Sequence, residues 1–436
     1  MSSVPSRLPG VALLDLLRGN PDFRRLFLAS ALSLTGDWFT FVALNAFVYH
    51  RTGSAALTAL LFAVESLPGI LLMPLIGSLT DRLDRRRLRI ACDLAAIVPL
   101  AGLLAAFHLG SVPLALVSLA VLSVSAAVSS PIPEVVLPNL VAPDRLPIAQ
   151  ATLGSLYSSS LLLGAGLGGL VTAAWGSTAT LLIDAASFAA SAVLIARIRR
   201  PFSTAPVTRR MRVRTDTSEL WRFIRDTPTV SALLWLTAAL RLCYGIVGLL
   251  PVYALERFGA TDAGIGVLYL AQGIGSVLGP FLGRRLIGTS PPPIDTSPLT
   301  GTSPLTGPSS RRRLLVPGGA LAVFGLGYLA LAQAGSLWSG IPAAMAGHLG
   351  VGACAILAIN GLQLASPDHI RGRVMVTAFG LSSGLQGVSS LAVAPLTVAL
   401  GMTGATRLLG VLAVGFALVW LLYALRLPKP PGESDR

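Results

Sequence analysis

The chain has 436 residues, of which 53% are hydrophobic and only 12% are charged. Soluble globular domains carry about 25% charged residues, so this composition excludes a soluble globule. The formal net charge of +14 does not indicate a nucleic-acid partner, because the arginines are scattered between apolar runs instead of forming one basic region.

Long uncharged runs predict membrane-spanning helices. Residues 314–367 and 374–406 contain no Asp, Glu, Lys or Arg. A spanning helix needs roughly 20 apolar residues, and backbone polar groups inside lipid must be satisfied within the segment. We therefore predict an all-α membrane protein with twelve transmembrane helices. The predicted spans lie near residues 25–49, 54–80, 88–109, 112–138, 148–174, 177–197, 229–252, 262–287, 314–334, 338–364, 373–400 and 404–427.

The charges between these spans predict the orientation. Arg51, Arg257 and Arg407 fall in the predicted outer loops and Arg241 falls inside a span, whereas the other basic residues lie on the inner side. Basic residues accumulate in cytoplasmic loops. We therefore expect both termini in the cytoplasm, with no signal peptide before the first span. The spans predict a multi-pass protein of the inner or plasma membrane, and the excess of arginine over lysine, with abundant Ala, Leu and Gly, suggests a high-GC bacterial genome.

The two halves of the chain repeat each other. Arg18-Gly19-Asn20-Pro21 corresponds to Arg225-Asp226-Thr227-Pro228, and Pro143-Asp144-Arg145-Leu146 corresponds to Pro367-Asp368-His369-Ile370. We predict two pseudo-symmetric six-helix bundles, one over residues 1–199 and one over residues 229–436. A cytoplasmic linker over 200–228, with a short interfacial helix near 218–227, joins them.

The second half carries an insertion at about residues 288–310. It contains the sequence Thr-Ser-Pro-Leu-Thr-Gly twice, at 296–301 and 302–307. Such a low-complexity stretch predicts a disordered cytoplasmic loop. Internal repeats of this size are typical of secondary transporters, in which the substrate path lies between the halves and access alternates by rocking.

Ionisable residues inside the spans are candidate functional residues, because a charge in the bilayer is costly. Asp37 and Arg241 both lie near the predicted midplane, as does Glu65. Glu65 is either a proton-coupling acid or a helix-packing hydrogen-bond partner. His348 is either a titrating group or a packed hydrogen-bond donor. For Asp184 we favour a structural hydrogen bond, and Glu134 is a candidate gating contact.

Aromatic and amide side chains within the spans predict a site for an amphipathic ligand of moderate size. Simple packing is the alternative for each of them. These residues are Trp38, Phe41, Asn45, Trp235, Tyr244, Asn360 and Gln363.

The loop at residues 77–87 resembles the motif between helices 2 and 3 of the major facilitator superfamily. The matching residues are Gly77, Leu79, Asp81, Arg82, Arg85 and Arg86. Further stretches resemble the enterobactin-exporter and macrolide-efflux-like branch of that superfamily. They are Asn20–Leu26, Gly36-Asp37-Trp38, Pro131–Val141 and Pro367–Met375. Many drug–proton antiporters of the superfamily carry an arginine in helix 4, but residues 114–133 contain none.

The resemblance implies two roles for charged residues. Helices 1 and 7 face each other in the superfamily, so Asp37 and Arg241 are predicted to pair, either as a static ion pair or as a pair that a proton or cationic substrate releases. The loop aspartate of the superfamily latches the two halves together. The corresponding Asp81 is predicted to contact Arg371, Arg373 and the start of helix 11, unless the loop only fixes topology.

These features together predict a secondary active transporter that exports a small amphipathic compound by alternating access, coupled to protons. A drug, a macrolide-like compound or a siderophore would fit. The alternatives are an importer of a small nutrient and a non-transporting membrane scaffold or sensor. We expect no enzymatic activity, no cofactor, no metal and no nucleic-acid partner. The expected partners are the substrate, protons and the lipid bilayer, with the protein acting as a monomer.

Overall fold

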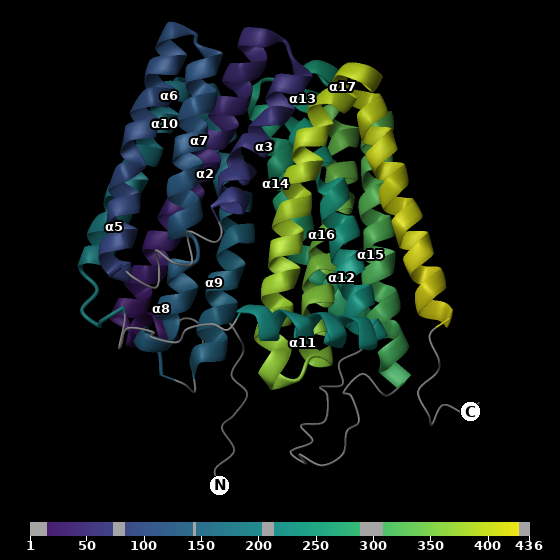
Figure 1. Ribbon diagram of the computed structural model, residues 1–436. Helices are drawn as coiled ribbons and strands as arrows, with labels where there is room; N and C mark the ends of the chain where they lie inside the picture. The colour runs from purple at the N-terminus through teal and green to yellow at the C-terminus, as the bar shows by residue number, and fades with distance from the viewer. Residues whose placement is uncertain (1–14, 73–82, 143–144, 203–212, 288–307, 427–436) are drawn as a thin grey trace. The chain divides into compact units, whose positions relative to one another are not determined.

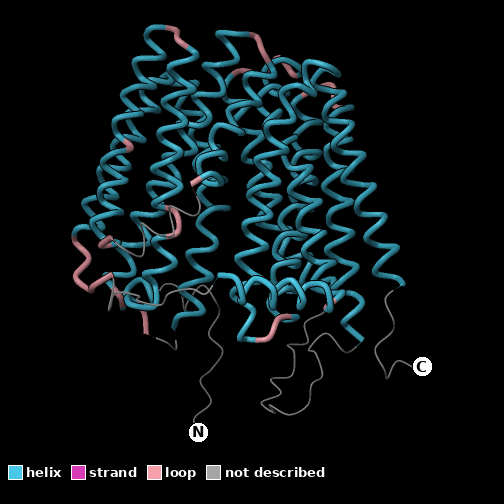
Figure 2. Tube along the Cα trace, in the orientation of Figure 1, coloured by secondary structure: helices cyan, strands magenta, loops and turns pink. Residues whose placement is uncertain are grey.

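The computed structural model describes residues 15–72, 83–142, 145–202, 213–287 and 308–426. Within these ranges the chain is helical with short connecting loops and contains no strand, as Figure 2 shows. The predicted all-α fold class is therefore confirmed. The inserted residues 288–307 and the loop residues 73–82 lie outside the described ranges, and α15 begins at Pro308, inside the range predicted for the insert.

Nine helical stretches in the described part of the chain are long and apolar enough to cross a membrane. Two of them, Ile148–Ala196 and Arg373–Arg426, each cover two predicted spans. They bend where predicted spans meet, at Gly176 with φ 79° and Gly401 with φ 70°. Only glycine adopts such left-handed angles without strain. The number of twelve spans stays a prediction, because part of the second predicted span lies outside the described residues.

The chain divides into two compact units, and each is described by itself. The first unit comprises residues 1–54, 64–209 and 261–270. It contains the later part of α3 (Ala55–Leu71) and the first turns of α14 (Asp262–Ile287). The helices that lie wholly within it are α2 (Pro21–Thr52), α5 (Arg85–Ala95), α6 (Ile97–Leu109), α7 (Val112–Ser129), α8 (Ile132–Leu140), α9 (Leu146–Ser160), the π-helical turn η2 (Leu161–Ala165) and α10 (Gly166–Ala196).

The second unit comprises residues 55–63, 210–260 and 271–436. In Figure 1 its amphipathic helix α11 crosses the ends of α12 and α17, which it contacts. The helices of this unit are α11 (Val213–Asp226), α12 (Pro228–Cys243), the 3₁₀ turn η3 (Tyr244–Leu249), α13 (Leu250–Val252), the π turn η4 (Tyr253–Arg257), α14 (Asp262–Ile287), α15 (Pro308–Gln333), α16 (Leu337–Ala365) and α17 (Asp368–Arg426). The predicted bundle and linker boundaries stay predictions.

Local sequence signals start and stop the first long helix. Asn20 caps α2, because its side-chain Oδ1 accepts a hydrogen bond from the backbone N–H of Phe23 at 2.9 Å, and Pro21 follows as the first helical residue. Gly53 ends the helix in the left-handed conformation. The Asn20 amide also donates to the carbonyl of Leu140 at 2.8 Å, so the cap ties α2 to the end of α8.

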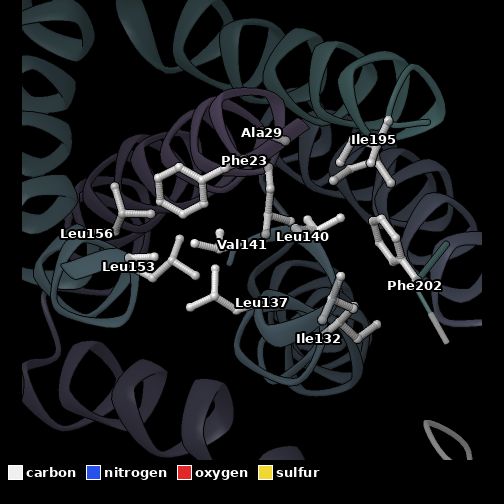
Figure 3. Close-up of a cluster of buried hydrophobic side chains, with 14 of the residues drawn as sticks. Phe23, Ala29, Ile132, Leu137, Leu140, Val141, Leu153, Leu156, Ile195 and Phe202 are labelled. Carbon is white, nitrogen blue, oxygen red and sulfur yellow. The ribbon is translucent and has the colours of Figure 1, made fainter. Parts of the chain in front are cut away.

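A buried apolar cluster holds one end of the first unit together (Figure 3). Phe23 of α2 packs with Leu137 of α8, Leu153 of α9 and Ile195 of α10. The carboxylate of Asp22 adds polar bonds there, since it accepts from the backbone N–H groups of residues 199 and 200 at 3.2 and 3.1 Å. This end of the helical bundle is thereby fixed by both packing and hydrogen bonds.

Candidate functional site

A polar cavity of about 180 Å³ lies within the first unit, and we call it the acidic cavity. Side chains of α2, α3, α5, α7, α8 and α10 line it. The lining residues are Ser30, Ser33, Leu34, Asp37, Trp38, Phe41, Glu65, Arg89, Ala126, Ser129, Ser130, Pro133 and Phe188. Two carboxylates and one guanidinium therefore border the same space.

Arg89 is the basic residue of this cavity and is held by a buried network. Its side chain is 4% exposed, and its Nε lies 3.1 Å from Oδ1 of Asp93, one turn further along α5. Its terminal nitrogens donate to the Ser129 carbonyl at 3.3 Å and the Ser191 hydroxyl at 3.4 Å. The Ser191 hydroxyl in turn donates to Oδ2 of Asp93 at 2.7 Å. Asp93 and Arg89 thus form a buried ion pair fixed to α7 and α10.

The predicted coupling residues Asp37 and Glu65 are brought together in the acidic cavity. Arg89 already neutralises Asp93, so one guanidinium cannot also balance both of these carboxylates. An unbalanced negative charge inside a membrane is costly unless a proton or a cation compensates it. The cavity therefore has the chemistry of a site that binds protons or a cationic group. Ser30, which also lines the cavity, is 5% exposed, and its hydroxyl has no hydrogen-bond partner among the described residues.

Asp184 of α10 has the structural hydrogen bonds that the sequence predicted. It is fully buried, and its carboxylate accepts from the Thr40 hydroxyl at 2.5 Å and the Ser187 hydroxyl at 3.1 Å. The bond from Thr40 joins α10 to α2, and the bond from Ser187 lies within α10. Glu134 of α8, the candidate gating contact, is exposed within its unit.

Aromatic side chains border the acidic cavity on one side. Trp38 and Phe41 have ring centroids 5.8 Å apart, and Tyr269 of α14 lies 5.7 Å from Trp38 and 6.3 Å from Phe41. Asn45 lies further along α2 and is 1% exposed, with its amide bonded to the Phe41 carbonyl at 2.7 Å. Two predicted aromatic residues thus line the cavity. The Asn45 amide is used in a local helix bond.

The second unit holds a separate cluster around Arg241. The guanidinium donates to Oε1 of Gln386 at 2.8 Å and lies 5.3 Å from the ring centroid of Tyr244. Tyr244 lies against His348, with ring centroids 6.2 Å apart. Nδ1 of the fully buried His348 lies 3.2 Å from the Ala344 carbonyl and 3.5 Å from the Tyr328 hydroxyl. His348 is therefore packed as a hydrogen-bonded side chain.

The remaining predicted residues have varied surroundings. Asn360 is exposed within the second unit. The Arg371 side chain donates to the carbonyl of Gln363 at 3.0 Å, and Arg373 pairs with Glu219 of α11 at 2.8 Å. In the first unit Arg86 donates to the carbonyl of Arg200 at 2.9 Å. Arg85 begins α5.

Two predicted interactions stay predictions. The latch depends on Asp81, which lies outside the described residues together with Gly77 and Arg82. The pair of Asp37 with Arg241 would join the two units, whose contacts are not described.

Sequence reasoning missed Arg89 and Asp93. Both lie inside the predicted span 88–109, but Arg89 comes two residues after the charged loop at 77–87, and neither residue is among the candidates that the sequence predicts. The useful signal was the spacing, because an arginine and an aspartate four residues apart face each other on a helix. An ion pair at that spacing inside an apolar run indicates a buried charged network.

The fold and these charged interiors define a multi-pass membrane transporter. The family model of the Major Facilitator Superfamily matches residues 26–377, which is most of the chain. The protein belongs to this superfamily.

Curated relatives include efflux proteins. The chain is 25% identical to macrolide efflux protein A of Streptococcus pyogenes over 271 residues, covering 60% of this chain and 65% of that protein. It is 28% identical to the multidrug efflux pump Tap of Mycobacterium tuberculosis over 192 residues, covering 41% and 44%. The chain thus spans slightly less than two thirds of the first relative and less than half of the second. Both names agree with the efflux-like branch that the sequence predicted.

Solved structures share the fold. A POT family transporter in complex with 5-aminolevulinic acid superposes with a TM-score of 0.72 at 12% identity, covering 94% of this chain and 97% of that one. The nucleoside transporter NupG superposes with a TM-score of 0.67 at 10% identity, covering 93% and 99%. At these identities the likeness extends to the fold alone.

Proposed function

We propose that this transporter exports a small amphipathic compound in exchange for protons. The observation that carries the proposal is the acidic cavity, in which Asp37 and Glu65 share one space with an arginine already engaged by Asp93. Protons entering from one side of the membrane would neutralise these carboxylates. A cationic or hydrogen-bonding substrate would replace the protons during the opposite half of the cycle.

The cavity walls support an amphipathic substrate. Trp38 and Phe41 offer apolar ring faces, whereas the serine hydroxyls and the two carboxylates offer polar contacts. A few polar groups in an aromatic pocket select ligands with both characters. The efflux activity named for the relatives adds support for export of a drug-like or macrolide-like compound. Siderophore export is a further possibility within the same chemistry.

The proposal includes the two predicted interactions that would couple the halves. Asp81 would act as a latch with Arg371 and Arg373, and Arg241 would exchange its partner with Asp37 during the cycle. Both follow from the superfamily resemblance and from the position of these residues in the sequence. In the described second unit, Arg241 and Arg373 each have another polar partner, Gln386 and Glu219, which these contacts would have to replace or share.

Transport into inverted membrane vesicles with an imposed pH gradient tests this function. A panel containing macrolides, cationic dyes and siderophores should show accumulation that requires an acidic lumen. The variants D37N and E65Q should each lower gradient-driven accumulation on the order of a hundredfold, because a neutral amide cannot bind and release the proton.

H348Q is the matched control, since His348 is a titratable side chain of the other unit with packing bonds of its own. It should retain the pH dependence of the unaltered protein. Full, pH-dependent transport by both D37N and E65Q would exclude the acidic cavity as the coupling site. Accumulation only in right-side-out vesicles would instead indicate an importer.

A further inference from the structure

Arg241 is the charged interior residue of the second unit, and only one corner of its guanidinium is hydrogen-bonded there. Nη1 donates to Oε1 of Gln386 at 2.8 Å. The buried Nε has no hydrogen-bond partner among the described residues, and no carboxylate of the described second unit contacts the group. An arginine presents five N–H donors in a planar fork. The edge formed by Nε and Nη2 is therefore available to a ligand.

The aromatic side chains around Arg241 hold the guanidinium in one orientation. Its Cζ lies 5.3 Å from the ring centroid of Tyr244, which is 7% exposed. The Tyr244 ring is itself packed between Phe324 and His348, with centroids 6.5 and 6.2 Å away. An arginine that stacks on an aromatic face loses less freedom when it binds a further group. The Nε–Nη2 edge is therefore a preorganised pair of donors.

The α-helical part of this segment is interrupted just after Arg241. Helix α12 ends at Cys243, and the 3₁₀ turn η3 follows over Tyr244–Leu249. The backbone N–H of Gly245 donates to the Ser389 hydroxyl at 2.8 Å, so the turn is bonded to α17, which also supplies Gln386. Secondary transporters place their substrate sites near the bilayer midplane, at helices that are interrupted there. Arg241 combines both features, since it also lies near the predicted midplane.

A carboxylate is the group that fits the free edge of Arg241. Two parallel N–H donors match the two carboxylate oxygens, and such charged hydrogen bonds are the strong ones. A guanidinium inside a membrane is costly unless an anion compensates it. Gln386 offers a neutral amide oxygen and Tyr244 a ring face, so neither cancels the charge. A bound carboxylate would do so.

We propose that the Nε–Nη2 edge of Arg241 binds a carboxylate of the transported compound. The proposal rests on the proposed function and narrows the substrate class to amphipathic carboxylates, including zwitterions whose ammonium group suits the acidic cavity. Asp37, the partner that the sequence predicts for Arg241, carries the same chemical group. The substrate carboxylate and Asp37 are then alternative partners of this guanidinium during the cycle.

Binding of a fluorescent carboxylate to the purified full chain in dodecyl maltoside tests the proposal. Dansylglycine is the probe, and dansylglycinamide, in which a neutral amide replaces the carboxylate, is the matched control ligand. Fluorescence anisotropy gives both affinities after subtraction of the signal from protein-free micelles. We expect dansylglycine to bind about tenfold to a hundredfold more tightly, since hydrogen bonds to charged groups contribute on that order.

Variants test whether the preference for the carboxylate depends on Arg241. R241Q should remove the preference, and R241K should retain part of it, because lysine keeps the charge without the planar fork. Q386E should also remove the preference with Arg241 still present, since the new carboxylate would pair with the guanidinium beside it. R284Q, exposed at the end of α14, and Q150E, exposed on α9, are the charge-matched controls and should retain the preference.

Equal affinities for the two ligands in the unaltered protein would overturn the proposal, as would a preference that persists in R241Q and Q386E. Displacement of dansylglycine by chloride or acetate at equally low concentrations would also overturn it, because Arg241 would then accept any small anion. Binding in detergent needs no pH gradient. It can therefore fail while the vesicle assays of D37N and E65Q support the proposed coupling site, and the reverse also holds.

Discussion

The two units differ in the charged groups of their interiors. The first unit buries the carboxylates of Asp93 and Asp184 and places Asp37 and Glu65 in its cavity, with Arg89 as the basic residue there. Among the described residues of the second unit no buried carboxylate occurs, and its charged interior group is Arg241. In the part of the chain that the structure describes, the buried carboxylates thus lie in the first unit.

The proposed proton coupling would use this difference. A proton-binding function needs carboxylates in excess of their basic partners, which the first unit has. The cluster of Arg241, Tyr244 and His348 offers a cation and aromatic faces, which suit recognition or packing. The apolar helical framework can be shared by both units because packing requires only shape and hydrophobicity.

The largest expected effect concerns the buried ion pair of the first unit. R89L leaves Asp93 as an uncompensated buried charge and should destabilise the protein by about 3–5 kcal/mol. The double variant R89L/D93L should recover most of this loss, because it removes both charges. Thermal unfolding in detergent measures the stability of both variants. If the double variant is no more stable than R89L, the charge pairing is not the source of the effect.

The next largest effect is expected at one tightly packed glycine in each unit. A Cβ added at Gly245 would lie 2.5 Å from the backbone carbonyl oxygen of Ser389, and one at Gly36 would lie 2.2 Å from Oδ1 of Asp184. G245A and G36A should each lower stability by about 1–3 kcal/mol through overpacking. G384A is the matched control, because its added Cβ meets no atom within 4 Å, and it should be neutral or slightly stabilising. Equal unfolding temperatures for all three variants would contradict the tight contacts.

Variants of Arg241 can distinguish a structural role of this residue from a role in proton coupling. R241Q removes the guanidinium from Gln386 and from the Tyr244 ring and should cost about 1–2 kcal/mol of stability, with R241K retaining part of it. A static role leaves the pH profile of transport unchanged in R241K. A shifted pH profile in a well-folded R241K variant would favour the predicted exchange of partners with Asp37.

The smallest effect is expected at the pair of His50 and Asp262. Nε2 of His50 lies 2.7 Å from Oδ1 of Asp262, but the histidine is 58% exposed. H50Q and D262N should change the free energy of unfolding by less than about 1 kcal/mol, because solvent screens such pairs. Denaturation at low and high salt checks this expectation. A larger, salt-insensitive loss would show that the pair is shielded from solvent.

Much of the fold follows from local sequence patterns. The apolar runs predicted the helices, and the starts of α14 and α16 lie within a residue of the predicted spans. Gly176 and Gly401 lie between adjacent predicted spans, where the helices bend. The family also followed from a local pattern, the loop motif at 77–87. Its key residue Asp81 lies outside the described part of the chain, so the latch stays a prediction.

The sequence by itself determined the membrane location, the helical class and the superfamily, since these depend on composition, run length and short motifs. Only the tertiary structure decided which charges share a cavity. It placed Arg89, which pairs with Asp93, in the wall of the cavity that Asp37 and Glu65 also line. The reason is physical. Helix formation is governed by neighbours within a few residues, whereas charge balance and cavity lining depend on helices that are distant in the chain and meet only on packing.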